Sequence, residues 1–315
     1  MHAMKLVLAA AAAGMTLASG SAFAEETAAP QKFEEVVGSG LPTLEKDQAL
    51  HDMLPAAIRE AGVITIATDA NYPPCQSFAS DNVTIIGYEP DLWNAITQKL
   101  GITYDVDSIA FAGLIPGVES GRYDMASECI SDNLEREKRV DFVVHAYATG
   151  AVYTLAENTV ITEDTKSLCG LTVGVQQGFD FINVVNNVMT PHCEMAGLPA
   201  VKANEYPSAD AVLLSLYSGR VDFVLNNLAA AQAIQEAAPR PVRLVTNAHL
   251  PKYYNGMVVK KGNDELSGAL LAALQAVHEA GVYDQVMAKW GISSLALDEP
   301  GINLASSKPL EYPKP

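Results

Sequence analysis

The chain has 315 residues, of which 49% are hydrophobic, and its 37 acidic against 20 basic residues give a formal net charge of -17. Nucleic acid and anionic lipid repel so acidic a chain, which excludes functions that depend on binding either one. The length is enough for two domains or for one large one.

The first 24 residues have the pattern of a cleavable secretory signal. Lys5 precedes a run that is almost wholly apolar from Leu6 to about Leu17, and Ala22-Phe23-Ala24 forms an A-x-A site before Glu25. The run is too short to span a bilayer, and no later segment reaches the roughly 18 apolar residues that would. We therefore expect residues 1–24 to be removed and the mature protein to be exported and soluble.

Four cysteines follow this segment, in a compartment that permits disulfides. Four cysteines allow three connectivities. We predict a bond between Cys169 and Cys193, and leave open whether Cys75 and Cys129 bond to each other or stay free. There is no C-x-x-C motif, and no His lies near these cysteines at metal-ligand spacing, so no metal site is expected.

Helices and strands alternate along the first half of the chain. A polar arm at 25–47 leads into a predicted helix over 47–60, where Leu50, Leu54 and Ile58 lie four residues apart. The elements expected next are a buried strand at 63–68, a strand ending near 87–88, a helix at 91–100 that Asp91 caps, a strand at 103–107 and a helix at 113–119.

The chain repeats part of its own plan. The segment S-G-R-Y-D-M at 120–125 returns as S-G-R-V-D-F at 218–223, and in both places a helix ends on Gly and a strand begins. The strand at 171–175 leads into a turn much as the strand at 63–68 does. These landmarks predict two α/β lobes, each a mostly parallel sheet flanked by helices.

Ligands of open α/β sheets bind beyond the carboxyl ends of the strands. Four such ends are rich in hydroxyl, amide and carboxylate groups, namely 69–72, 127–131, 176–180 and 226–227. If the lobes face each other, these four loops line one cleft, with Tyr72 and Phe111 as aromatic surface. Such a cleft suits a small zwitterion that closure shields from water.

Six motifs, in this order, carry a resemblance to a known family. They are T-D-A-N-Y-P-P (68–74), I-G-Y-E-P-D-L (86–92), A-G-L-I-P (112–116), S-G-R-Y-D-M (120–125), E-R-E-K-R-V-D-F (135–142) and V-V-K-K-G-N (258–263). Over about residues 50–295 the chain resembles the periplasmic amino-acid-binding proteins of ABC uptake systems, solute-binding protein family 3.

The resemblance implies a type II periplasmic binding protein fold with a two-strand hinge near 148–153 and 249–256. Lobe 1 would comprise 48–150 and the return segment 251–296, lobe 2 would comprise 151–250, and 297–315 would form a C-terminal tail. It also implies a periplasmic monomer without a cofactor that delivers its solute to an inner-membrane ABC permease.

The resemblance also assigns ligand-binding roles to individual residues. Arg136 would grip the ligand carboxylate, for which a permanently charged, bidentate guanidinium is well suited. Tyr72 would cover the ligand, Phe111 would form an apolar wall, and Ser131 would supply a hydroxyl contact. The alternatives are a surface ion pair of Arg136, core packing of the two aromatic residues, and a helix-capping role for Ser131.

The lobe-two loop would bring Gln176 and Asp180 to the carboxylate end of the ligand, although turns favour such residues in any case. Cys129, beside Glu128, is counted among the ligand-binding residues. Asp69 is expected to support the site from behind or to form a turn.

Two residues depart from the family pattern. Asn227 stands where the family usually has an Asp that pairs with the ligand ammonium, and Glu128 stands where a small residue is common. A carboxylate that faces a cleft is costly unless a cation pairs with it. Our hypothesis is that Glu128, with Asp180, pairs with a cation of the ligand, which favours a basic amino acid or a cationic derivative. The alternative is that Glu128 pairs with Arg136 or with a group of lobe 2.

These observations predict a solute receptor and not an enzyme. An exported dehydratase-like enzyme on the same scaffold, with Glu128 as a general acid, is one alternative. No nucleophile–base pair or phosphate loop supports it. A sensor that docks on a signalling receptor is the other alternative, and it would need the same solute chemistry. The sequence does not name the solute.

Overall fold

The computed structural model describes residues 40–245, 250–311 and 313. The predicted signal over 1–24, most of the predicted arm and residues 246–249 of the predicted lobe 2 and hinge lie outside this range. Among the helices of the described residues, none combines the length and the apolar character needed to cross a bilayer.

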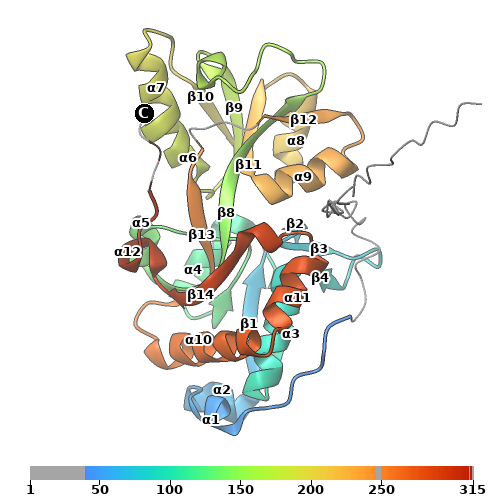
Figure 1. Cartoon of the computed structure of the whole chain (residues 1–315), viewed down its shortest axis with the longest axis vertical. Helices are drawn as coiled ribbons and strands as arrows, with labels where there is room; N and C mark the ends of the chain where they lie inside the picture. Colours follow the sequence, from blue (N-terminus) through green and yellow to red (C-terminus); the bar gives the residue numbers. More distant parts are fainter. Residues whose placement is uncertain (1–39, 246–249, 312, 314–315) are drawn as a thin grey trace, which may run out of the picture. The chain divides into compact units, whose positions relative to one another are not determined.

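The lower lobe of Figure 1 is built on a short parallel sheet. The strand β1 (Val63–Thr68) pairs in parallel with β5 (Thr103–Ser108) and β6 (Met125–Ala126). The β-branched residues of β1 favour a pleated strand, and most of its side chains are buried. The main helices of this lobe are α3 (Tyr88–Leu100), α4 (Leu114–Glu119), α10 (Asp264–Glu279) and α11 (Val282–Lys289).

The upper lobe repeats this arrangement. In it β9 (Thr172–Gln176) pairs in parallel with β10 (Lys202–Tyr206) and with β11 (Phe223–Asn227). Its α-helices are α6 (Phe181–Val184), α7 (Thr190–Met195), α8 (Ala209–Tyr217) and α9 (Leu228–Ala237). A π-helical turn, Val185–Met189, joins α6 to α7, and a 3-10 turn, Thr165–Leu168, precedes β9.

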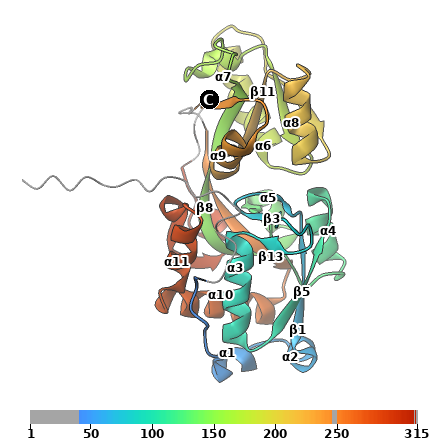
Figure 2. The ribbon, with the colours of Figure 1, turned by 90° about the vertical axis from the view of Figure 1, so that its right-hand side faces the viewer.

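Two long strands connect the lobes, as Figure 2 shows for β8. The strand β8 (Val140–Leu155) pairs over its first part with β13 (Lys252–Lys260) and over its last part with β11 and β12 (Val242–Val245). One strand therefore pairs in both lobes and connects them directly. A bulge between Asn255 and Gly256 shifts the register of β13 where it pairs with Val144 and Ala146 of β8.

A small separate sheet holds the first aromatic residue of the predicted cleft. It consists of β2 (Asn71–Tyr72), β3 (Gln76–Phe78) and β4 (Ile85–Ile86). Gly87 follows β4 with φ of +152°, and a Cβ there would lie 2.1 Å from the carbonyl oxygen of Cys75. Only glycine therefore lets the start of α3 lie this close to the small sheet.

Two helices differ from the sequence predictions. The helix predicted over 47–60 is two helices, α1 (Gln48–Asp52) and α2 (Ala56–Ala61), because Pro55 interrupts it and cannot donate a helical hydrogen bond. The prediction that Asp91 caps the next helix is wrong. The helix α3 begins at Tyr88, and Asp91 accepts hydrogen bonds from Lys289 Nζ at 2.8 Å and Trp290 Nε1 at 2.7 Å.

The residues predicted to form a C-terminal tail contain regular structure. The strand β14 (Ala296–Ile302) pairs antiparallel with β8, and the helix α12 (Leu304–Ser307) follows it. Leu297 and Leu304 are buried, which explains why this segment lies against the lobe and does not leave it.

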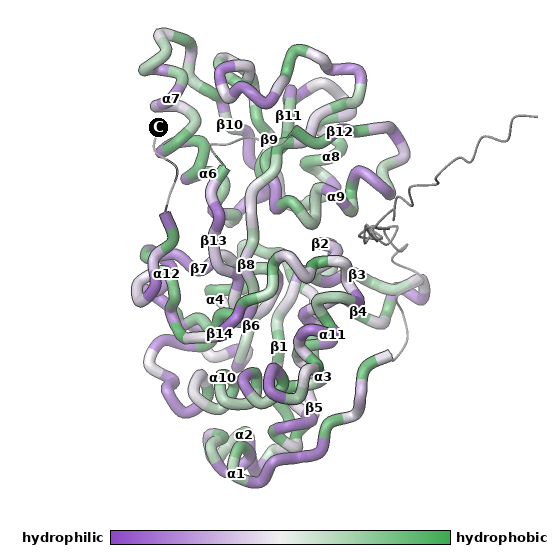
Figure 3. The backbone as a smooth tube through the Cα atoms, in the orientation of Figure 1, coloured by the Kyte–Doolittle hydropathy of each residue, from purple (hydrophilic) through white to green (hydrophobic). Residues whose placement is uncertain are grey.

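Apolar residues line the inner faces of both sheets and of the helices that cover them, as the green stretches of β1 and β8 in Figure 3 illustrate. The main core includes Trp93, Phe142, Phe223 and Tyr283, all nearly inaccessible to solvent. A smaller cluster around Tyr153 and Val224 lies in the upper lobe. The main core contains buried residues of both lobes, such as Trp93 of α3 and Phe223 of β11, so one apolar cluster spans the two lobes.

Candidate functional site

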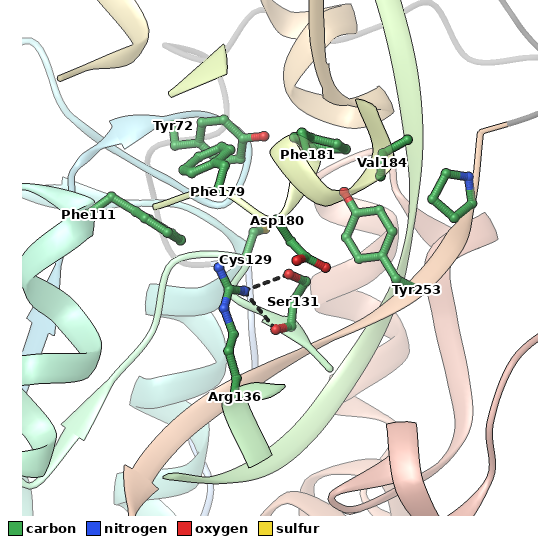
Figure 4. A pocket seen from close by; sticks show the side chains of 11 residues that line it. Tyr72, Phe111, Cys129, Ser131, Arg136, Phe179, Asp180, Phe181, Val184 and Tyr253 are labelled. Atoms are coloured by element: carbon green, nitrogen blue, oxygen red, sulfur yellow. Dashed lines mark hydrogen bonds between the residues drawn. The ribbon is translucent and has the colours of Figure 1, made fainter. Parts of the chain in front are cut away.

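A pocket lies where the loops of the two lobes meet (Figure 4). Aromatic side chains bound one side of it, whereas Arg136 and Ser131 lie on the opposite side. The lining residues are Tyr72, Phe111, Cys129, Ser131 and Arg136 from the lower lobe, Phe179, Asp180, Phe181 and Val184 from the upper lobe, and Pro251 and Tyr253 near the connecting strand.

The short helix α5 (Leu134–Glu137) places Arg136 at the pocket. Asn133 caps this helix, because its side chain accepts hydrogen bonds from the amides of Glu135 and Arg136. Arg136 Nη1 donates to the carbonyl oxygen of Ser131 at 2.8 Å and to its hydroxyl at 2.6 Å. Burial lowers the pKa of Arg136, and Asp180 is the main group that opposes this shift, so the guanidinium stays charged.

The aromatic side of the pocket is made by residues from both lobes. The ring of Phe179 lies 5.1 Å from that of Tyr72 and 4.3 Å from that of Phe111, measured between centroids. The hydroxyl of Tyr72 donates to the side-chain oxygen of Asn226 and accepts from the amide of Asn227 at 3.3 Å. Burial raises the pKa of Tyr72, so its hydroxyl keeps its proton and can donate.

Glu128 is not among the residues that line this pocket. Its side chain is fully buried, and neither carboxylate oxygen has a hydrogen-bond partner among the described residues. Burial, followed by the nearby carboxylates of Asp69 and Glu89, raises its pKa well above the usual range, and Arg136 opposes the shift. The pairing of Glu128 with Arg136 or lobe 2, predicted as the alternative, is not found among the described residues.

Three other predicted residues join or support the lobes and are not among the lining residues. The side chain of Gln176 donates to Asp69 Oδ2 at 3.3 Å across the cleft, and the same oxygen accepts from the amide of Phe111 at 3.2 Å. Asn227 caps α9, because its side-chain oxygen accepts from the amide of Ala229 at 2.9 Å. These contacts occupy acceptor oxygens of Asp69 and Asn227 within the protein.

Both cysteine pairs are bonded. Cys169–Cys193 joins the segment before β9 to α7 with a Cα–Cα distance of 5.5 Å. Cys75–Cys129, with a Cα–Cα distance of 5.9 Å, joins the small sheet that carries Tyr72 to the turn that carries Glu128. This second disulfide therefore connects two loops of the site.

A pair of acidic residues supports α5 from the side opposite the pocket. Asp132 accepts from the amide of Ala305 at 2.9 Å, and Glu137 accepts from the amide of Ser306 at 3.1 Å, so the first turn of α12 holds both carboxyl groups. Burial, together with neighbouring Glu137, raises the pKa of Asp132 to about 7. The hydrogen bond from the amide of Ala305 acts in the opposite direction and lowers this pKa. The helix that carries Arg136 thus depends on the C-terminal segment.

Sequence reasoning did not identify several residues of the pocket: Phe179, Phe181, Val184, Pro251 and Tyr253. Phe179 and Phe181 flank the predicted Asp180. Two aromatic residues beside a predicted ligand contact could have indicated that they line the pocket as well. Tyr253 lies in the segment that was predicted as hinge, and no side chain of that segment was assigned a binding role. Among the described residues, no group of three or more His, Cys, Asp or Glu side chains is placed to hold a metal ion.

Comparison with known proteins identifies the family of this chain. The profile of the bacterial extracellular solute-binding proteins, family 3, matches residues 64–293. An arginine-binding protein of Corynebacterium glutamicum is 28% identical over 279 residues, covering 89% of this chain and 88% of the relative. An L-arginine-binding protein of Pseudomonas aeruginosa is 26% identical over 233 residues, covering 72% and 87%.

Solved structures give the same result for the fold. An ancestral arginine-binding protein bound to arginine superposes with a TM-score of 0.64 at 29% identity, covering 73% of this chain and 98% of the other. The same kind of ancestral protein bound to glutamine gives a TM-score of 0.65 at 29% identity, with the same coverage.

Proposed function

Because the chain belongs to the family 3 bacterial extracellular solute-binding proteins, we propose that it is an exported receptor for a basic amino acid or a small cationic derivative. The lobes close on the solute, and the closed form delivers it from the periplasm to an inner-membrane ABC permease. The relatives are named as binding proteins, and the chain is accordingly a receptor and not an enzyme.

The buried carboxyl group of Glu128 is the observation that carries the preference for a cation. An ionised carboxylate without a partner is unstable in an apolar interior, so the group is held neutral until a positive charge comes close. Cys129, the next residue in the chain, lines the pocket, and a ligand cation beside it would stabilise the ionised form of Glu128. Binding should then release a proton from Glu128.

The pocket supplies the remaining contacts that a cationic amino acid needs. The guanidinium of Arg136 and the hydroxyl of Ser131 suit the ligand carboxylate. Aromatic rings that line the pocket, such as that of Tyr253, attract a cation through their π-electrons. The arginine-binding relatives support a ligand of this charge type.

A thermal-shift screen of residues 25–315 against amino acids, polyamines, betaines and carboxylates is the first test. A ligand present at 100 times its dissociation constant adds about 2.7 kcal/mol to the unfolding free energy and raises the melting temperature. A shift caused by a basic amino acid supports the proposal. Shifts caused only by carboxylates without an ammonium group would contradict the cationic ligand while keeping the receptor role.

The Glu128→Gln variant tests the role of this side chain. We expect it to weaken binding of the cationic ligand more than tenfold and to abolish the accompanying proton release, measured by calorimetry in two buffers of different ionisation enthalpy. Glu135→Gln is the matched control, because the Glu135 side chain is 77% exposed and is not a lining residue. An unchanged dissociation constant in Glu128→Gln would overturn the assignment.

Two alternatives remain distinct from this proposal. A dehydratase-like activity with Glu128 as a general acid is the weaker alternative, because the relatives compared above are named as binding proteins. A sensor would bind the same solute but dock on a signalling receptor, and permease genes beside this one would favour transport.

A further inference from the structure

The turn after β9 carries an aromatic ring into the cleft. The amide of Phe179 donates to the carbonyl oxygen of Gln176 at 3.2 Å, which closes the turn. The side chain then extends between Tyr72 and Phe111 of the other lobe, and Phe179 as a whole is only 8% exposed. Figure 4 shows this ring next to Tyr72 on the aromatic side of the pocket.

Two features hold this turn against the opposite lobe. Gly178 has φ of +85°, and a Cβ there would lie 3.2 Å from the ring of Phe111 and 3.3 Å from the Cα of Ala112. A larger residue would therefore push the turn away. In addition, Arg136 Nη2 donates to the carbonyl oxygen of Gly178 at 2.7 Å. The position of Phe179 is thus fixed by its neighbours on both sides.

We infer that Phe179 determines which ligands fit, because its ring fills the space between Tyr72 and Phe111 that a long cationic side chain would otherwise enter. A long ligand has to displace the ring and lose its edge-to-face contacts with both neighbours. The receptor therefore prefers short cationic amino acids to lysine and arginine. This inference rests on the proposed function and narrows its ligand class.

The test is a series of ligands of increasing length: 2,3-diaminopropionate, 2,4-diaminobutyrate, ornithine, lysine and arginine. Calorimetry should show that the protein binds one of the shorter members best. In Phe179→Ala, the affinity for arginine relative to the shortest member should rise at least tenfold. Phe179→Leu, which keeps an apolar side chain but shortens it, should shift the order in the same direction and serves if the alanine variant is unstable.

Phe78→Ala is the control, because it also removes an aromatic ring, but Phe78 is 37% exposed in β3 and is not among the lining residues. It should keep the order of preference found in the unmodified protein. An unchanged order in Phe179→Ala, or an equal loss for every ligand, would overturn the inference and leave the receptor proposal intact.

A measurement without ligand separates this inference from the proposed function. The melting temperatures of Tyr72→Ala, Phe179→Ala and the double variant should be non-additive, because the two rings pack together across the cleft. Additive changes would overturn the inference alone. Binding of no ligand in the series by any of the proteins would contradict the proposed function, and the role of Phe179 with it.

Discussion

The guanidinium of Arg136 donates a hydrogen bond of 2.7 Å to the carbonyl oxygen of Gly178, and these two residues belong to different lobes. The same guanidinium also donates to Ser131 within its own lobe. One side chain therefore holds the lower face of the pocket and connects it to the turn of the upper lobe.

Replacing Arg136 with Lys should weaken ligand binding at least tenfold. The charge is kept, but a single ammonium group cannot reproduce the planar fork that reaches Ser131 and Gly178 together. Calorimetry measures the effect, and Arg139→Lys is the control, because Arg139 is 53% exposed and pairs with Glu119 on the surface. Affinity within twofold of the unmodified protein would contradict a direct role for the fork.

The stability of the protein should fall between about pH 4 and pH 7 through Asp132. Its pKa is about 7 in the folded protein and about 3.9 in an unfolded chain, so the folded state binds more protons in this interval. The contribution of Asp132 is fully present below pH 4 and is lost as the pH rises through 7. Denaturant titrations from pH 4 to pH 8 should show this slope, and Asp132→Asn should flatten it. An equal slope in both proteins would exclude Asp132 as its origin.

Glu128→Gln should stabilise the ligand-free protein increasingly as the pH rises. Burial raises the pKa of Glu128, so its contribution to stability is present at low pH and is lost as the pH rises through the folded-state pKa. Glutamine stays neutral throughout, and the difference in unfolding free energy between variant and unmodified protein should grow with pH. A difference that is constant with pH would show that Glu128 does not titrate in the folded state.

Removing the disulfide Cys75–Cys129 should weaken binding more than removing Cys169–Cys193 does. Each disulfide constrains the unfolded chain by about 3 to 5 kcal/mol, so both double Cys→Ser variants should be less stable. Only the first, however, joins the segment of Tyr72 to the turn of Glu128. Binding measured at a temperature where both variants are folded separates the two effects, and equal losses of affinity would contradict the prediction.

The fold class and several lining residues could be predicted because their signals are local in the sequence. The strand at 63–68 ends in a polar turn, and the matching strand at 171–175 does the same, which was enough to expect two similar lobes facing one cleft. Arg136 and Ser131 were each expected at the cleft, and both are among the residues that line the pocket. The domain boundaries and the binding roles of these residues stay predictions.

Other features depend on contacts between distant parts of the chain. Asn227 has a polar amide at the end of a strand, as a ligand contact would, yet its side-chain oxygen caps α9. In the sequence, Phe179 has no feature that sets it apart from other turn residues. Its role depends on contacts with Tyr72 and Phe111, which belong to the opposite lobe. The strand β14 was predicted as tail because its pairing partner, β8, lies far away in the sequence.

The bonds from α12 to Asp132 and Glu137 also bear on the order in which the protein becomes active during its production. Because a chain is synthesised from its N-terminus, Arg136 is made long before residues 305 and 306. The segment that carries Arg136 therefore gains these two bonds only after residues 305 and 306 have been made. A polypeptide cut short before Ala305 would keep every lining residue of the pocket but lack two of the hydrogen bonds that hold α5 in place.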